Sequence, residues 1–125
     1  MNIELNKSVK SLLILEELGL LAGSMILFSL TTHFEWWIYA ILFFIPDISF
    51  AAYLINTKIG SAVYNIFHHK GMMIAMIVTG YYTELEWILA VGIVFLGHAA
   101  FDRIFGYGLK FSDDFKHTHL GRTGK

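Results

Sequence analysis

Four apolar stretches dominate this chain, and each is long enough to cross the roughly 30 Å hydrocarbon core of a bilayer. They cover residues 9–30, 36–55, 59–82 and 85–109. Apolar runs of about 20 residues predict transmembrane helices. We therefore expect an all-α fold, an integral membrane four-helix bundle in which residues 1–125 form a single membrane domain. Residues 110–125 would form a cytoplasmic tail.

The third stretch allows two interpretations, because Lys70 interrupts it. It is either one continuous span or an interfacial helix that ends at His69, followed by a short span over residues 71–82. The sequence leaves both open.

Composition favours a membrane environment over water. Hydrophobic residues make up 56% of the chain and charged residues only 15%, against about 25% in soluble domains. A soluble fold of 125 residues has too small an interior for eleven Phe and three Trp. A net charge of −1 without a dense cluster of Lys and Arg excludes nucleic acid as a partner and leaves membrane lipid. Because the chain has no Cys, any metal must use nitrogen and oxygen ligands.

The connections between the stretches differ in charge. Residues 31–35 and 83–86 contain no Lys or Arg, whereas all nine basic residues lie before or at the start of the first stretch, around the second connection, or at the end of the fourth stretch and beyond. By the positive-inside rule, both termini and the second connection are cytoplasmic. An even number of spans follows, which agrees with four. Aromatic residues would then form a belt at the outer interface: Trp36, Trp37, Tyr81, Tyr82 and Trp87.

Every apolar stretch carries polar or ionisable residues, which are costly in a bilayer and usually face a bundle interior or a water-filled cavity. With a rise of about 1.5 Å per residue, those of the first, second and fourth stretches lie about 9 to 18 Å from the nearest cytoplasmic lysine. We therefore expect one water-accessible site in the cytoplasmic half. The candidates are Glu16, Glu17, Asp47, Asn65, His68, His69, His98, Asp102 and Arg103.

Helical phase selects among the candidates of the first stretch. Gly19 and Gly23 form a G-x-x-x-G pair, which is typical of a close helix contact and also offers a face for a homo-oligomer. Glu16 lies within about one quadrant of both glycines, while Glu17 points away. We therefore expect Glu16 to be the acid that faces inward.

The other stretches supply a set of metal ligands. Asn65 and His68 share one stripe of the third stretch, and His98 and Asp102 are spaced i, i+4 on the fourth. Pro46 removes a helical N–H beside Asp47 and predicts a kink there. Imidazoles and carboxylates that project inward from several helices can hold Zn, Mn or Fe. The predicted ligands of this divalent metal are Asp47, His68, His98 and Asp102. The alternative is a hydrogen-bonded network that only specifies helix register.

Several motifs together resemble the small bacterial membrane-protein family catalogued as domain of unknown function 4260. They are Leu15-Glu16, Pro46-Asp47-Ile48-Ser49, Tyr64-Asn65-Ile66-Phe67-His68, His98-Ala99-Ala100-Phe101-Asp102-Arg103, Gly106-Tyr107-Gly108-Leu109-Lys110 and Thr118-His119-Leu120-Gly121. The resemblance implies a four-helix membrane domain and no established activity. Glu17, His69 and His117 fall outside the motifs. A looser similarity to inner-membrane metal-dependent hydrolases rests on the Pro-Asp element, the later histidines and the His-x-x-x-Asp helix, and it favours metal hydrolysis, although those families carry additional His-rich motifs that this chain lacks. We expect a multi-pass protein of the bacterial inner membrane.

These observations lead to three hypotheses. The first is a metal-dependent membrane hydrolase that acts on a lipid or amphiphile from the cytoplasmic leaflet. The second is a proton- or ion-coupled transport or channel module, and the third is a non-catalytic membrane partner protein. For the hydrolase we predict catalytic roles for Glu16, as general base, and for His119, in a tail that reaches back over the cavity. Substrate binding is assigned to Tyr64, Asn65, Arg103, Tyr107 and Lys110.

Overall fold

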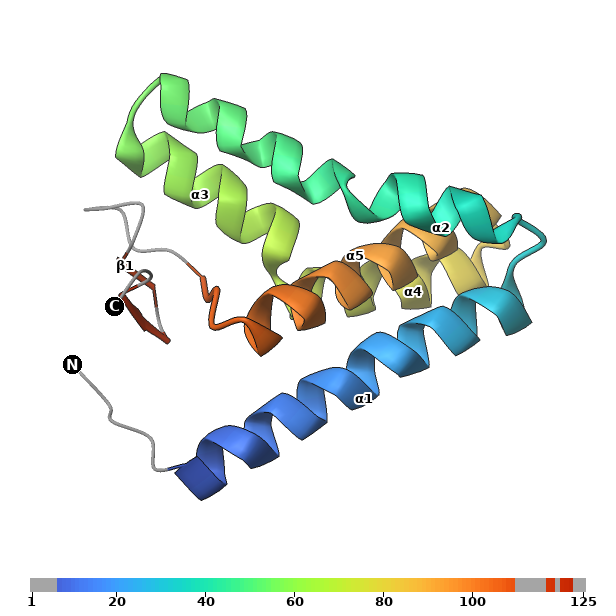
Figure 1. Ribbon diagram of the computed structural model, residues 1–125. Helices are drawn as coiled ribbons and strands as arrows, with labels where there is room; N and C mark the ends of the chain where they lie inside the picture. Colours follow the sequence, from blue (N-terminus) through green and yellow to red (C-terminus); the bar gives the residue numbers. More distant parts are fainter. Residues whose placement is uncertain (1–6, 110–116, 119, 123–125) are drawn as a thin grey trace.

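The computed structural model describes residues 7–109, 117–118 and 120–122, and its described part is almost entirely helical (Figure 1). The predicted all-α class is confirmed. Besides the helices, the described residues contain one antiparallel pair of strands, each of two residues. The elements in chain order are α1 (Lys7–Thr31), α2 (Trp36–Phe43), the 3₁₀ helix η1 (Ile45–Leu54), α3 (Thr57–His68), α4 (Lys70–Tyr82), α5 (Glu86–Ile104), β1 (His117–Thr118) and β2 (Gly121–Arg122).

Three helices are long and apolar enough to cross a membrane, as judged by length and composition. They are α1, the continuous α2–η1 segment and α5. The chain is therefore a membrane protein. The third apolar stretch is divided at His69, so the continuous helix over residues 59–82 is wrong and the alternative division after His69 is what the structure has. The count of four passes stays a prediction.

The second apolar stretch changes its helix type at Pro46. Proline lacks the N–H that would continue the α-helical ladder, and its ring clashes with the preceding turn. From Ile45 onward the backbone is 3₁₀-helical, and the N–H of Asp47 donates to the carbonyl of Phe44 at 3.2 Å. The predicted kink therefore takes the form of a change to tighter winding, which begins at the residue before Pro46.

A second break separates α3 from α4. His69 has an extended backbone (φ −85°, ψ 113°), and its Nδ1 accepts a hydrogen bond from the N–H of Met72 at 3.2 Å. The side chain thus caps the start of α4, as an N-cap residue does. At the other end of α3, the side chain of Asn56 accepts a hydrogen bond from the N–H of Ile59 at 2.8 Å.

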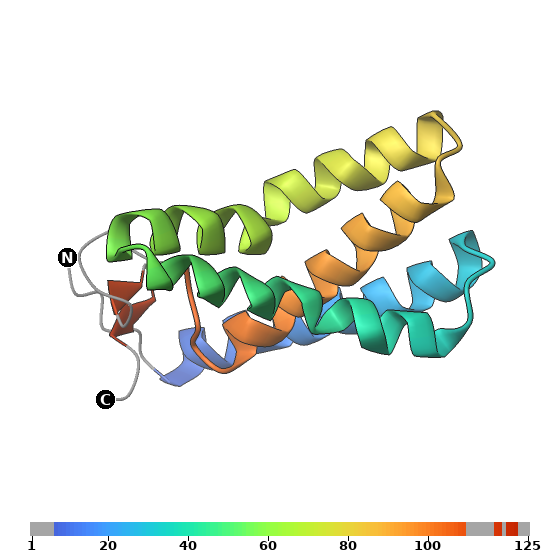
Figure 2. The same ribbon diagram turned by 90° about the horizontal axis from the view of Figure 1, so that it is seen from above.

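Helix α5 forms the centre of the bundle. It is the most buried helix, with α1 and α4 packed along it and α3 packed against η1 (Figures 1 and 2). Side chains of α1 and α2 come close to α5 at Gly97, where a Cβ would lie 2.3 Å from both Ser24 Oγ and Tyr39 OH. A side chain there would push α1 and α2 away from α5. Gly19 and Gly23, in contrast, have no neighbour within 4 Å of a Cβ built on them, so they make no close helix contact in the described chain.

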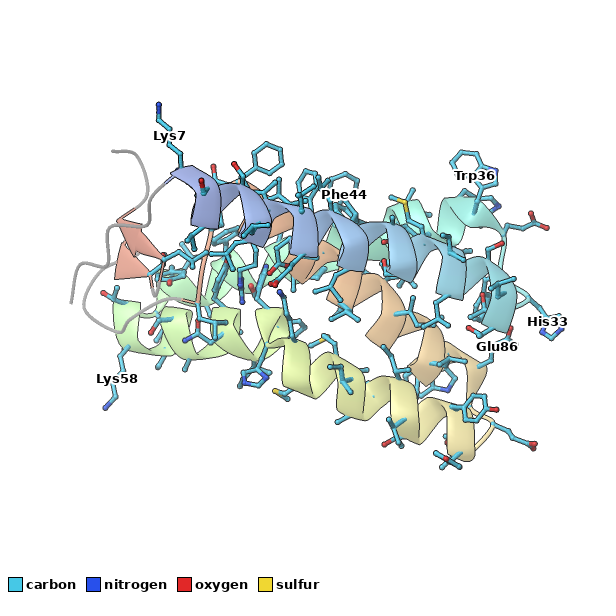
Figure 3. The ribbon with its side chains drawn as sticks, turned by 90° about the horizontal axis from the view of Figure 1, so that it is seen from below. Lys7, His33, Trp36, Phe44, Lys58 and Glu86 are labelled. Carbon is cyan, nitrogen blue, oxygen red and sulfur yellow. The ribbon has the colours of Figure 1, made fainter. Side chains whose placement is uncertain are left out.

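The two ends of the bundle differ in charge. Lys7 and Lys58 lie at one end, and His33, Trp36 and Glu86 at the other (Figure 3). At the second end the Nδ1 of His33 lies 3.1 Å from Glu86 Oε1, and the His33 backbone N–H donates to the same oxygen. This arrangement matches the charge pattern from which we inferred the orientation. The side of the membrane on which each end lies stays a prediction.

Candidate metal centre

Four ionisable side chains from three helical elements meet at one point. Asp47 comes from the first turn of η1, His68 is the last residue of α3, and His98 and Asp102 lie one turn apart on α5. Each offers one ligand atom, and these four atoms lie within 4.8 Å of one another. The structure thus brings together all four residues that the sequence predicted as ligands.

Three of the distances between these atoms are close to those in a coordination sphere. His68 Nε2 lies 3.2 Å from Asp102 Oδ2, and His98 Nε2 lies 3.4 Å from the same oxygen and 3.3 Å from Asp47 Oδ1. Ligands about 2.0–2.1 Å from a shared tetrahedral ion are about 3.3–3.4 Å apart. The Nε2 atoms of His68 and His98 are buried, and neither makes a well-directed hydrogen bond to a described residue. Both nitrogens lie beside the same carboxylate oxygen, Asp102 Oδ2.

The tautomer of His68 follows from its other ring nitrogen. Nδ1 lies 2.8 Å from the backbone carbonyl of Tyr64, one turn earlier in α3. Because a carbonyl only accepts hydrogen bonds, Nδ1 carries a proton, and in the neutral imidazole Nε2 then presents its lone pair to the cluster. This is the usual arrangement of a metal-binding histidine, whose second nitrogen donates to a fixed acceptor.

Neighbouring side chains hold the ligands in place. The Tyr64 ring stacks on the His68 ring, with centroids 3.8 Å apart and planes at 13°, and its hydroxyl donates to Asp102 Oδ2 at 3.3 Å. The Phe43 ring meets the His98 ring edge-on at 4.9 Å. Arg103 donates from Nη2 to the carbonyl of His68 at 3.2 Å, which satisfies a backbone acceptor at the end of α3.

The cluster is closed on most sides and open at one. The side chains of His68 and His98 are 0% and 2% exposed and that of Asp102 is 14% exposed, but the side chain of Asp47 is 45% exposed. Any substrate or water that reaches the cluster therefore approaches beside Asp47.

The inward acid of α1 differs from the prediction. Glu16 is exposed, whereas Glu17 is only 16% exposed and its carboxylate pairs with the ammonium of Lys70 at the start of α4. The predicted facing was wrong because we took Gly19 and Gly23 as the mark of the packed face. Helix α1 instead turns Ser24 and Phe28 toward the core, and Glu17 lies on that stripe at helical spacing.

The remaining predicted site residues divide into two groups. His119 and Lys110 lie outside the described residues. Of the others, Tyr64 is buried and supports the ligands, Asn65 is half-buried, and Tyr107 is exposed with its carbonyl accepting from Arg103 Nη1 at 3.0 Å. Arg103 thus has both terminal nitrogens on backbone carbonyls. The supporting role of Tyr64 was missed, although its position four residues before His68 places it one turn away on the same face.

Fold and site together define a helical membrane protein with a buried His–Asp cluster that could hold a metal ion. The chain belongs to the family described as Domain of unknown function (DUF4260), whose model matches residues 10–123, and the resemblance expected from the motifs is confirmed. No curated protein and no solved structure matches the chain.

Proposed function

We propose that this protein is a metal-dependent membrane hydrolase whose ion is held by Asp47, His68, His98 and Asp102. The observation that carries the proposal is the pair of buried Nε2 atoms of His68 and His98, which face two carboxylates and make no directed hydrogen bond to a described residue. Buried polar atoms in proteins are nearly always hydrogen-bonded. A cluster that served only to fix helix register would be expected to close these bonds.

The donor set favours particular metals and a particular chemistry. Two imidazoles and two carboxylates suit Zn, Mn or Fe, and a six-coordinate Mn or Fe ion would keep two positions for water or substrate beside these four ligands. A bound divalent ion would polarise a carbonyl or phosphoryl oxygen and lower the pKa of a water ligand to about 7.

The residues of the cluster divide the remaining tasks. Asp47 has the most accessible carboxylate, so the oxygen of this carboxylate that does not hold the ion is our candidate to take the proton from the attacking water. That role passes to Asp47 because Glu16, the predicted base, is exposed on α1. His68 and Asp102, both supported by Tyr64, would hold the ion.

The surroundings of Asp47 support an apolar substrate. Phe44 and Ile48 flank it in the chain and are 65% and 68% exposed on a helix that is apolar enough to lie in a membrane. A lipid or amphiphile could therefore approach the cluster sideways from the bilayer. Entry from the cytoplasmic leaflet follows if the end with Lys7 and Lys58 is cytoplasmic.

Ion-coupled transport is a second candidate, and the break between α3 and α4 favours it, because transporters build ion sites at interrupted helices. In such sites, backbone carbonyls freed by the break coordinate the ion. Here the carbonyl of His68 at the break accepts a hydrogen bond from Arg103 instead. Because this carbonyl is already bonded, the break between α3 and α4 does not favour transport over the hydrolase.

Metal analysis of the purified protein tests the proposal. We expect about one transition metal per chain in the wild type, restored by Zn, Mn or Fe after chelation. His98→Ala should lose it, whereas the matched control His33→Ala, at the opposite end of the bundle, should keep it. The metal-loaded wild type, but not His98→Ala, should cleave long-chain ester or phosphoester substrates. A wild type without stoichiometric metal after reconstitution would reject the proposal.

A further inference from the structure

A groove between α1 and α2 lies at the end of the bundle that carries Trp36. Its volume is about 430 Å³. That is near the lower end of the range for ligand sites, roughly 300–1,000 Å³, so it suits one slender ligand. The lining residues are Met25, Phe28, Ser29, Phe34, Trp36, Tyr39 and Ala40.

The groove offers a ligand almost only apolar surface. No charged residue lines it, and the hydroxyl of Tyr39 is already bonded to Ser24 Oγ at 2.6 Å. Both walls belong to helices that are apolar enough to cross a membrane. Hydrocarbon therefore fits the groove better than a polar ligand, which would be left without partners.

A series of aromatic rings connects the groove with the metal cluster. Tyr39 in the groove wall stacks on Phe43 at 6.1 Å, and Phe43 contacts His98 at 4.9 Å. Phe43 also meets Phe101 of α5 at 5.3 Å, and both Phe101 and Phe44 are partly exposed. Between Asp47 and Ala40 the helix rises about 12 Å. Along this distance the exposed rings of Phe44 and Phe101 present apolar surface between the cluster and the groove.

We infer that the groove receives the distal part of a single long acyl chain whose polar head lies at the metal cluster beside Asp47. This inference rests on the proposed function and names its substrate class as a long, single-chain amphiphile or lipid acyl chain. With the head toward the end of Lys7 and Lys58, the chain would run toward the opposite end, as the chains of one leaflet do. The groove would then select substrates by chain length.

The test uses the full chain in phosphatidylcholine vesicles and a sixteen-carbon fatty acid that carries a photoreactive diazirine at its chain end. After illumination, mass spectrometry of peptides should find the label mainly on the groove residues of α1 and α2. Ala40→Phe and Ser29→Phe, which fill the groove from opposite walls, should lower this labelling about tenfold, as expected for two lost methylene contacts. Ala75→Phe is the matched control, because Ala75 is an exposed alanine on α4, away from the groove.

A chelator arm and metal analysis of the same samples separate the outcomes. Groove labelling that falls when the metal is removed supports a head group at the cluster. Groove labelling that chelation leaves unchanged overturns the inference, since the groove then holds bulk lipid. Label spread evenly over the exposed helix faces, and unaffected by Ala40→Phe, also overturns it. If the wild type binds metal but shows one of these two overturning results, the inference is rejected and the proposed function stands. A wild type that takes up no metal rejects the proposed function.

Discussion

At the scale of single residues, Tyr64 does the most to shape the cluster without offering it a ligand. Its backbone carbonyl sets the His68 tautomer, its ring covers one face of that imidazole, and its hydroxyl reaches Asp102. Three contacts from one side chain and its own backbone thus orient two of the four ligands. Partners of this kind typically change metal affinity by about 10- to 100-fold.

Tyr64→Phe should therefore weaken metal binding by about tenfold or more while the fold survives, because the ring and the carbonyl remain and the bond to Asp102 is lost. Titration against a competing chelator measures the affinity, and circular dichroism checks the fold. Tyr81→Phe, exposed on α4, is the control. Equal affinities for Tyr64→Phe and the wild type would show that the hydroxyl does not support the ligands.

The double substitution His98→Leu with Asp102→Asn separates a site from a structural network. Buried polar groups cost free energy, and hydrogen bonds in membranes return only about 0.6 kcal/mol on average. We expect the metal-free double variant to unfold at or above the temperature of the metal-free wild type. Added Zn or Mn should raise the unfolding temperature of the wild type only.

Thermal unfolding in detergent, with chelator and with metal, measures both effects. If the double variant is strongly destabilised under chelator and the wild type shows no response to metal, the cluster is a structural network.

At the scale of helical elements, the site lies where two helices depart from regular α-helix. The 3₁₀ helix η1 brings in Asp47 near its start, and α3 stops at His68 before α4 begins in a new direction. The junction between α3 and α4 is joined to α1 by the ion pair between Glu17 and Lys70, both of which are largely buried. Helix α1 thus braces the start of α4 beside the cluster.

Glu17→Gln should lower the unfolding temperature, because Lys70 would keep its charge in a largely buried position without its partner. Loss of a charged partner there costs about 1–3 kcal/mol. Glu16→Gln, one position away and exposed, should leave stability within about 0.5 kcal/mol of the wild type. Thermal scans of both variants in the same detergent make the comparison. Equal effects would mean that the ion pair does not brace the bundle.

The i, i+4 pairing of His98 and Asp102, the disturbance at Pro46 and the fold class could be predicted because local rules determine them. An i, i+4 pair lies on one face of any α-helix, Pro46 disturbs any helix that contains it, and long apolar runs favour helices in a membrane. The facing of Glu16 and Glu17 could not be predicted in the same way. It depends on which side of α1 meets α5, and that is decided by the close approach of Ser24 to Gly97 from a distant segment.

At the scale of the whole molecule, the bundle has one end with lysines and one end rich in aromatic residues (Figure 3). The cluster is nearer the lysine end, because His98 and Asp102 lie in the last turns of α5, while the groove lies at the aromatic end. This polarity suits an amphiphile better than a uniformly polar or apolar ligand.

Orientation can be measured cleanly, because the chain contains no cysteine. Lys58 and Glu35 are exposed at opposite ends of the bundle, so each can be replaced by a single cysteine. A membrane-impermeant thiol reagent added to intact cells should label Glu35→Cys and not Lys58→Cys. After the cells are lysed, both should react. The reverse result in intact cells would invert the topology and place the cluster in the outer half.

The cluster draws its members from η1, α3 and α5, which are separated by long stretches of chain. A protein emerges from the ribosome N-terminus first, so Asp47 and His68 are made well before the helix that supplies His98 and Asp102. Before α5 has left the ribosome, the nascent chain holds only one imidazole and one carboxylate of the set, which is too few to retain an ion. An ion held by all four side chains would therefore have to arrive after the last helix has joined the others in the bilayer, and a chain that fails to insert that helix would not acquire one.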